Sequence, residues 1–356
     1  MKRTRIGFLI TSASWNNFQR WHYYTSLALY ERGYDVVLIA PGKHRIFTRL
    51  KTKKVKVVPY NRTGFFLYDI MRLAFILRKN FVNTLFFNYP NDLAVVGFTK
   101  MLSPVSKIYF RKGTVPGIKS NHLNRLIFNR FITGIITNSK ANREEILTEK
   151  RNTVKTPNIE VIYQGLHLDR YKRVNGNWPK GKDEKKLRIG IYNSAFYRDN
   201  LCIELLRHLK EYFDSSNVKF IVYQDTLSPE FRRILRKNDL TQFVSFDMIG
   251  RSLKEFLASV DVYISPDISN AFNYSLLYAM VMRKPVIAVS QGSNKEIIEH
   301  GKNGFLIDKE NLDILGQFIE KLKDKKFRET MGEQSMQNVK KNFNFEQTVD
   351  KLETIL

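Results

Sequence analysis

The chain has 356 residues, 43% of them hydrophobic, which is enough for about two domains that each bury a core. It carries 59 Lys and Arg against 34 Asp and Glu, a formal net charge of +25. The single cysteine, Cys202, excludes an internal disulfide framework and a cysteine-rich zinc site.

The sequence shows no run of about 18 apolar residues that would predict a membrane-spanning helix. The apolar run at residues 6–10 is too short for the core of a signal peptide. We therefore expect a cytoplasmic protein.

The positive charge lies almost entirely in the first half. Residues 1–180 carry 32 Lys and Arg against 9 Asp and Glu, a net +23, whereas the rest of the chain carries 27 against 25. A field of that size attracts polyanions. Nucleic acid, an anionic membrane surface and an anionic lipid-linked substrate are the candidate partners.

In chain order, the first half alternates buried apolar runs with helical patterns. Residues 5–9 predict a strand, residues 17–32 a helix that ends at Gly33, and residues 35–40 a second strand. The further predicted strands are 54–59, 84–88, 107–110, 134–138 and 159–163, and the further helices are 69–79, 93–101, 123–131 and 144–148. This alternation predicts a parallel sheet covered by helices on both faces.

Residues 172–186 are polar and rich in Gly and Pro, which indicates a linker between domains. The alternation then restarts, with predicted strands at 187–192, 219–223, 244–246, 262–265, 286–289 and 305–307. We predict an α/β protein of two Rossmann-like domains, residues 1–180 and 181–340. A last helix around 345–356, within segment 341–356, is expected to cross back to the first domain.

Residues 259–308 carry the most specific pattern in the chain. A strand ends at Pro266, a turn and a helix follow, and then come Pro285-Val286, a glycine turn and a closing Gly301-Lys302-Asn303-Gly304. This pattern resembles that of the retaining glycosyltransferases of family 4, the glycosyl transferases group 1. The matching residues are Pro266, Phe272, Leu276, Ala279, Met280, Pro285, Val286, Ala288, Gly292, Glu296, Gly301, Asn303, Gly304 and Leu306.

The resemblance implies the GT-B fold, in which two Rossmann-like domains face each other across a cleft. It extends more loosely over residues 5–41 and 159–171. In the second of these segments Gly165 and Asp169 match the family, while Gln164 replaces an asparagine.

The turn that opens the helix after strand 262–265 is a candidate phosphate site. Free N–H groups and the positive end of a helix dipole attract anions. The residues of this turn are Ala271, Phe272, Asn273, Tyr274 and Ser275. They suit the diphosphate of a nucleotide sugar, although an ordinary strand-to-helix connection would look the same. The resemblance implies that Glu296 and the turn Gly292-Ser293-Asn294 hold the donor sugar.

The chain departs from the family at its most functional positions. The family carries two glutamates eight positions apart, and here those positions are Asn270 and Tyr278. It also carries an Arg and a Lys after the first strand of the second domain, and Asn193 and Arg198 stand there. Arg198 is expected to bind the diphosphate, with a solvated surface arginine as the other interpretation.

The acceptor side departs as well. Where the family has a glycine-rich loop, this chain has residues 11–17, of which Ser12, Ser14, Trp15 and Asn16 are the candidate acceptor-binding residues. Where the family often has His-Gly, Lys112-Gly113 follows Arg111. We expect Arg111 to bind the acceptor, and Lys112, with Arg198 and Asn270, to be catalytic; ordinary basic surface residues are the alternative for Arg111 and Lys112.

The predicted function is transfer of a sugar, with retention, from a nucleoside diphosphate sugar to a glycan or lipid-linked acceptor of cell-surface polysaccharide or glycolipid synthesis. The alternative is a degenerate member that binds a glycan or supports a partner protein. No metal or other cofactor is expected, because the six histidines are dispersed and no Asp-x-Asp is present.

Other functions fit less well. No zinc-finger spacing, aromatic RNA-binding signature or basic tail supports nucleic-acid binding. No G-x-G-x-x-G follows the first strand, and no P-loop is present. A sugar-nucleotide epimerase shares the two-domain form but fits residues 259–308 less well. Residues 65–81 and 119–131 are basic and amphipathic, so we expect peripheral binding to the inner face of the cell membrane, with packing on the sheet as the alternative for 65–81.

Overall fold

The computed structural model describes residues 4–12, 17–43, 46, 55–113, 122–149, 158–168, 186–192, 201–213, 217–224, 229–246 and 252–356. The chain divides into an N-terminal domain, Met1–Gln164 with Glu346–Leu356, and a C-terminal domain, Gly165–Phe345. The division falls between Gln164 and Gly165, earlier than the boundary expected at residue 180. The expected linker at 172–186 lies outside the described residues apart from Lys186.

The described part of the N-terminal domain is built on a seven-stranded parallel sheet. Its strands, in spatial order, are β3 (Lys56–Pro59), β2 (Asp35–Ala40), β1 (Arg5–Leu9), β4 (Thr84–Phe87), β5 (Lys107–Lys112), β6 (Gly134–Thr137) and β7 (Ile159–Val161). The inner strands are buried on both faces, as an all-parallel sheet requires.

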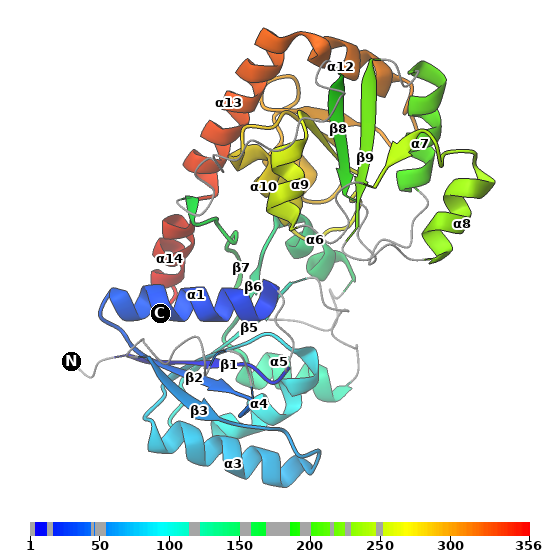
Figure 1. The fold of residues 1–356 in the computed structure, drawn as a ribbon. Helices are drawn as coiled ribbons and strands as arrows, with labels where there is room; N and C mark the ends of the chain where they lie inside the picture. The colour runs from blue at the N-terminus through cyan, green and yellow to red at the C-terminus, as the bar shows by residue number, and fades with distance from the viewer. Residues whose placement is uncertain are drawn as a thin grey trace. The chain divides into compact units, whose positions relative to one another are not determined.

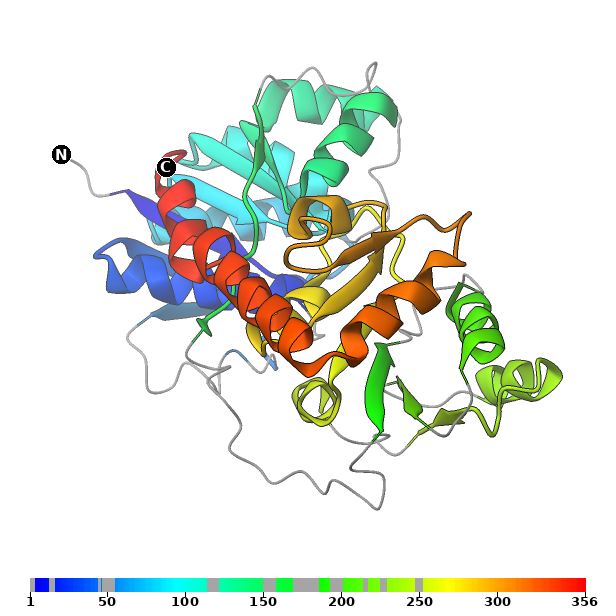
Figure 2. The ribbon, with the colours of Figure 1, turned by 90° about the horizontal axis from the view of Figure 1, so that it is seen from above.

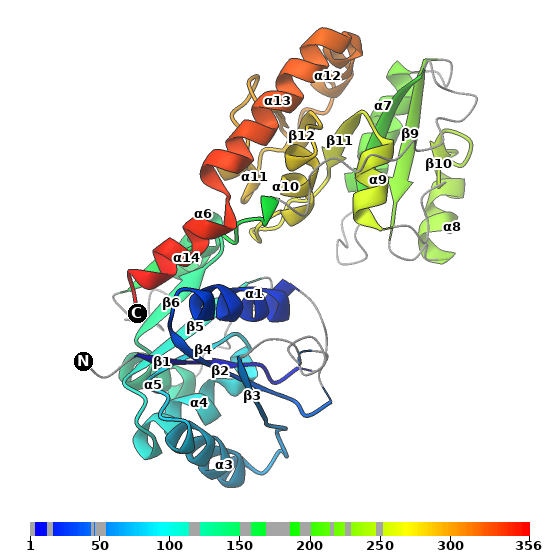
Figure 3. The ribbon, with the colours of Figure 1, turned by 60° about the vertical axis from the view of Figure 1, so that its left-hand side comes forward.

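Helices cover both faces of this sheet (Figures 1 and 3). One face carries α3 (Phe66–Lys79), α4 (Leu93–Thr99) and α5 (His122–Phe131), which pack side by side. The other face carries α1 (Asn17–Glu31) over a stack of rings in which Phe8, Phe86 and Tyr109 lie 5.1 and 5.2 Å apart. The remaining elements are η1 (Pro90–Asp92), η2 (Lys100–Leu102) and α6 (Lys140–Glu149).

The final helix, α14 (Phe345–Glu353), groups with the N-terminal domain although it follows the C-terminal domain in sequence. Arg32 contacts three of its carboxylates, those of Glu346, Asp350 and Glu353, at 2.8, 2.7 and 2.6 Å. The Tyr109 hydroxyl donates to the Ile355 carbonyl at 2.6 Å. The helix is therefore an integral part of the N-terminal domain.

The described part of the C-terminal domain repeats the architecture with a six-stranded parallel sheet. Its strands, in spatial order, are β10 (Val244–Ser245), β9 (Val218–Tyr223), β8 (Leu187–Tyr192), β11 (Val262–Ser265), β12 (Val286–Val289) and β13 (Phe305–Ile307). Its helices are α7 (Leu201–Tyr212), α8 (Pro229–Lys237), α9 (Leu253–Ser259), α10 (Tyr274–Val281), α11 (Asn294–Ile297), α12 (Ile314–Lys323) and α13 (Lys325–Asn342). Figure 2 shows α12 and α13 meeting at an angle; only Asp324 separates them, and its carboxylate caps α13.

The predicted order of elements is confirmed, and the differences lie at their ends. Gly33 has φ +89 and stops α1, as its position predicts. The helix predicted at 69–79 begins earlier, at Phe66, because Asp69 bonds to the turn before it instead of opening the helix. The helix predicted at 93–101 divides into α4 and η2, and the strand predicted at 107–110 continues to Lys112.

Candidate functional site

The carboxyl ends of the parallel strands mark the candidate site in each domain. In such sheets ligands bind beyond these ends, where the strand order reverses. That point lies between β1 and β4 in the N-terminal domain and between β8 and β11 in the C-terminal domain. The predicted acceptor residues follow β1 or end β5, and the predicted donor residues follow β8, β11 and β12. The described residues of each predicted set therefore lie at or after the carboxyl ends of strands in their own sheet.

The connection from β11 to α10 holds most of the predicted donor residues. Asn273 caps α10, because its Oδ1 accepts a hydrogen bond from the Leu276 N–H at 3.1 Å. In this segment Asn270 is exposed, and Tyr274 and Tyr278 are half-buried. Solvent therefore reaches all three of these side chains.

Asn273 itself is 2% exposed and has partners for its whole side chain. Its Nδ2 donates to Ser265 Oγ at 2.8 Å and to Asn294 Oδ1 at 2.9 Å. Its Oδ1 also accepts from Ser275 Oγ at 2.8 Å. A buried amide with every position satisfied holds its neighbours in place. The side chain of Asn273 thus ties α10 to the turn after β12.

That turn is held against the β11–α10 connection by two further residues. Ser293 Oγ accepts from the Asn273 N–H at 3.0 Å and donates to the Ala271 carbonyl at 2.8 Å. Asn294 Nδ2 donates to the carbonyls of Asp267 and Val289 at 2.8 and 2.9 Å. Both side chains are buried. We predicted direct donor contacts for these residues, and the structure gives their side chains a supporting position.

Gly292 allows the two loops to approach each other. Its φ is +55, a left-handed conformation that favours glycine. A Cβ at this position would lie 2.1 Å from the Ser269 carbonyl oxygen. No side chain therefore fits between the turn after β12 and the connection after β11.

The remaining predicted donor residues differ in exposure. Ala271 and Phe272 are buried, and the Phe272 ring packs 5.3 Å from Tyr274 and 5.6 Å from Phe343. Glu296, on α11, is half-buried. Phe272 therefore supports the domain through its side chain.

Several predicted residues lie outside the described part of the chain. They are Asn193 and Arg198 after β8, and Ser14, Trp15 and Asn16 after β1. Ser12 is described and is half-buried.

The two basic residues at the end of β5 are buried within the N-terminal domain. Arg111 is 2% exposed; its guanidinium lies 4.5 Å from the Trp21 ring centroid and donates to Gln164 Oε1 at 3.0 Å. Lys112 is 5% exposed, and its Nζ lies 2.9 Å from Glu145 Oε2. Both cations thus have partners inside the domain, and acceptor binding by Arg111 and a catalytic role for Lys112 stay predictions.

Sequence reasoning missed His22 and Asn88 beside Arg111. The Asn88 amide donates to His22 Nδ1 at 3.0 Å, and the His22 ring packs edge-on against Phe8 and Trp21. Burial, and secondarily the Arg111 charge, hold the pKa of His22 well below its ordinary value, so the ring is neutral. Asn88 directly follows β4 at the switch point, which is the signal that could have identified it.

Sequence reasoning also missed Asp92. Thr11 Oγ1 donates to its carboxylate, and Arg62 Nη1 lies 3.2 Å from the same group. Burial raises the pKa of Asp92, although the bonds from Thr11 and Arg62 oppose that shift. Asp92 thereby joins the segments that follow β1, β3 and β4.

Two negative findings apply to the described residues. No three His, Cys, Asp or Glu side chains among them gather in a way that could hold a metal ion. None of their helices has the length and apolar character needed to cross a bilayer.

The amino-acid sequence is similar to those of known glycosyltransferases. Residues 194–325 match the family model described as Glycosyl transferases group 1. N-acetyl-alpha-D-glucosaminyl L-malate synthase of Bacillus anthracis is 24% identical over 349 residues, which cover 92% of this chain and 90% of that protein.

Solved structures of other proteins superpose on this chain over nearly its full length. A glycosyltransferase from Rickettsia africae superposes with a TM-score of 0.82 at 15% identity, covering 100% of this chain and 98% of that one. Anabaena HepE, in complex with UDP and glucose, superposes with a TM-score of 0.79 at 17% identity, covering 99% of both chains. These likenesses establish the GT-B fold that the sequence predicts.

Proposed function

We propose that this chain, a glycosyltransferase with a glycosyl transferases group 1 domain and the GT-B fold, transfers a sugar with retention from a nucleoside diphosphate sugar to a glycan or lipid-linked acceptor. The observation that carries the proposal is the buried network around Asn273. It fixes the loops after β11 and β12 at the ligand-binding edge of the sheet.

The fixed loops after β11 and β12 suggest which residues would bind the nucleotide sugar donor. Preorganised N–H groups at developing negative charge supply much of the electrostatic stabilisation in transfer reactions. The N–H groups around Phe272–Ser275, other than that of Asn273, which Ser293 Oγ accepts, would bind the diphosphate together with Arg198. Asn270 and Glu296 would contact the sugar, with the Gly292–Asn294 turn beneath it. The solved Anabaena protein binds UDP and glucose, so a uridine diphosphate sugar is the first donor to test.

The proposed reaction needs little help from a general base. The bond between the anomeric carbon and the diphosphate breaks, and the acceptor oxygen bonds to that carbon on the same face. The proton of the acceptor hydroxyl passes to the leaving diphosphate oxygen. Arg198 stabilises the charge on that group, with Asn270 and Lys112 as the other residues for which we propose catalytic roles. Replacement of both family glutamates then weakens donor binding without removing the chemistry.

The acceptor side rests on charge. The first 180 residues carry a net +23, which favours an acceptor that is anionic or is presented on an anionic membrane. Ser12, Ser14, Trp15, Asn16 and Arg111 are the proposed acceptor residues. The proposed location is the inner face of the cell membrane, with peripheral attachment.

A thermal-shift measurement on the full chain tests the donor proposal. Because a ligand that binds only the folded state raises Tm, UDP at 100 times its Kd should add about 2.7 kcal/mol to the stability of the domain that binds it. Arg198→Ala should raise the apparent Kd for UDP at least tenfold and should therefore reduce the shift in Tm. Arg207→Ala, an exposed arginine on α7, is the matched control and should leave the shift unchanged. No shift with UDP, GDP, ADP or their sugars at millimolar concentration would reject donor binding and leave the glycan-binding alternative.

A further inference from the structure

We propose that the outward side of α3 and α5 is a docking face for an anionic lipid bilayer. The docking face is made by Phe65, Leu67, Met71 and Phe75 at α3 and by Leu123 and Leu126 on α5. This proposal rests on the membrane binding in the proposed function, and it adds which surface of the protein would contact the membrane. It is independent of the donor site.

Exposed apolar side chains are concentrated in one stretch of the N-terminal domain, which contains α3 and α5. Of the fourteen large hydrophobic residues that are exposed among the described residues, eleven lie between Phe65 and Leu126. Scattered exposed hydrophobic residues are normal, whereas a contiguous group marks an interaction surface.

Helix α3 shows the pattern most clearly. Leu67, Met71 and Phe75 follow one another at four-residue spacing and are 73%, 66% and 64% exposed. The opposite side of the same helix, with Leu73 and Leu77, is buried against the sheet. A surface helix of a water-soluble domain carries polar residues on its outer side. Since α3 is apolar on both sides, its outer side is suited to a second apolar environment.

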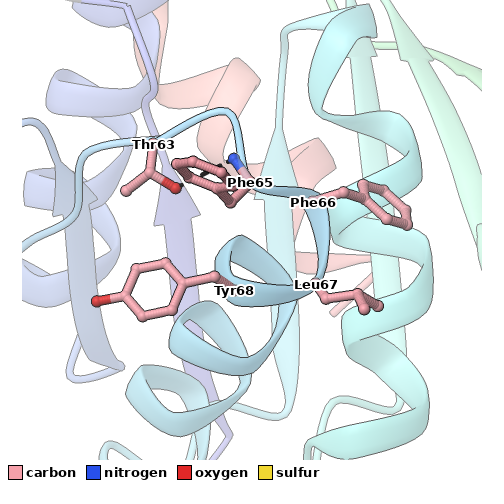
Figure 4. A pocket seen from close by; sticks show the side chains of 5 residues that line it. All are labelled: Thr63, Phe65, Phe66, Leu67 and Tyr68. Atoms are coloured by element: carbon pink, nitrogen blue, oxygen red, sulfur yellow. Dashed lines mark hydrogen bonds between the residues drawn. The ribbon is translucent and has the colours of Figure 1, made fainter.

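Hydrogen bonds hold the turn before α3 in one conformation, and this conformation keeps the aromatic residues at the start of the helix exposed. The Asp69 carboxylate accepts the N–H groups of Thr63 and Gly64 at 2.9 and 3.2 Å, and Thr63 Oγ1 accepts the Phe65 N–H at 3.3 Å. Gly64 has φ +91, which permits the turn. A hollow at the start of α3 is lined by Thr63, Phe65, Phe66, Leu67 and Tyr68. Figure 4 shows Phe66 and Leu67 directed to one side of this hollow and Tyr68 to the other.

Aromatic contacts connect α3 to α5 across α4. The Phe66 and Phe98 rings lie 5.9 Å apart, and Phe98 and Phe131 lie 5.8 Å apart. On α5 the outward residues Leu123 and Leu126 are 47% and 57% exposed. The exposed apolar residues therefore lie on two helices, α3 and α5, which half-buried Phe98 of α4 connects.

The positive charge around the docking face indicates which partner binds there. Residues 55–131 contain twelve Lys and Arg and only two carboxylates, Asp69 and Asp92, and both of these are buried. Exposed Arg78, Lys79, Arg125 and Arg130 flank the docking face. Apolar residues combined with Lys and Arg are the pattern of helices that lie in the headgroup region of an anionic bilayer. A second copy of this chain would bring the same positive charge, so the bilayer is the favoured partner.

Vesicle flotation with the full chain tests the docking face. Vesicles of phosphatidylcholine with 30% phosphatidylglycerol should bind the protein, and pure phosphatidylcholine should bind it at least tenfold more weakly. The double substitution Leu67→Glu with Phe75→Glu should lower the partition coefficient at least tenfold. Leu147→Glu, at an exposed leucine on α6 (37%), is the matched control and should bind like the unmodified chain.

Two further measurements make each result decisive. The UDP thermal shift, repeated on every variant, shows whether the variant is folded and whether the donor site works, so loss of docking and loss of donor binding are separated. Sedimentation equilibrium shows whether the double variant changes the oligomeric state. Equal flotation of the double variant and the unmodified chain would overturn the proposal. So would an unmodified chain that floats with neither vesicle, or a dimer that only the double variant dissociates.

Discussion

At the scale of single residues, the candidate donor site depends on one buried amide. Asn273 joins Ser265 at the end of β11, Ser275 in α10 and Asn294 in α11 through hydrogen bonds of 2.8–2.9 Å. Buried polar groups cost free energy unless they are satisfied, and here each bond also fixes a loop. The rigidity of the site therefore comes from residues behind its surface.

This arrangement limits what the sequence could predict about the site. The resemblance identified Asn273, Ser275, Ser293 and Asn294 as polar residues that follow parallel strands, and the structure has them after β11 and β12. Their side-chain directions depend on the hydrogen bonds between loops that are far apart in sequence, and no local pattern reports them. Arg111 and Lys112 illustrate the same limit, because their partners Trp21, Gln164 and Glu145 lie in α1, in the segment after β7 and in α6.

His22 makes the stability of the N-terminal domain depend on pH. The folded domain holds its imidazole neutral, whereas the unfolded chain takes up a proton below its ordinary pKa of about 6.5. The unfolded state thus binds more protons below that pH, and stability falls as pH falls, by up to about 1.4 kcal/mol per pH unit. Urea unfolding at pH 7.5, 6.5 and 5.5 measures this loss.

The substitution His22→Gln should remove that part of the pH dependence, because glutamine does not titrate. His122→Gln, at an exposed histidine on α5, should leave it unchanged. The same fall in stability between pH 6.5 and 5.5 with and without His22 would show that another group is responsible.

At the scale of elements, prediction succeeded where periodicity is strong. Every strand between β1 and β13 was predicted within two residues at each end, because buried parallel strands appear as short apolar runs between turns. The ends of α3, α4 and α6 were less accurate. Asp69 looks like a helix-opening residue in the sequence, but its carboxylate bonds backward to Thr63 and Gly64, and only the folded turn shows this.

The turn between β12 and α11 should be the element most sensitive to an added side chain. Gly292→Ala would strain the left-handed backbone and also press a Cβ onto the Ser269 carbonyl. Gly301→Ala is a matched control, because Gly301 has φ +79 but open space around it. The control should cost about 1–2 kcal/mol of unfolding free energy and Gly292→Ala roughly double that. Urea unfolding measures both, and equal costs would mean that the two loops separate without penalty.

At the scale of the whole molecule, α14 belongs to a domain that it does not follow in sequence. Val349 and Leu352 are fully buried, and the Thr348 hydroxyl donates to the Tyr163 carbonyl at 2.8 Å. Two buried aliphatic side chains contribute about 3–6 kcal/mol. The contacts of Arg32 with three partly exposed carboxylates add less, because solvent screens them.

Deletion of residues 346–356 should therefore lower the melting temperature of the N-terminal domain and leave that of the C-terminal domain in place. Differential scanning calorimetry should show one transition shifted downward and separated from the other. Arg32→Ala, which removes only the ion pairs, should shift the same transition by a few degrees at most. An unchanged thermogram after the deletion would mean that α14 contributes nothing to the stability of the N-terminal domain.

The position of α14 also sets the order in which the protein is completed on the ribosome. Domains usually finish folding in the order of their synthesis. Here the N-terminal domain is translated first, but its last helix emerges only after the whole of Gly165–Phe345 has been made. Until then, the carbonyl of Tyr163, the guanidinium of Arg32 and the hydroxyl of Tyr109 lack their partners on the last segment. The nascent chain thus carries an unfinished first domain through the translation of the second.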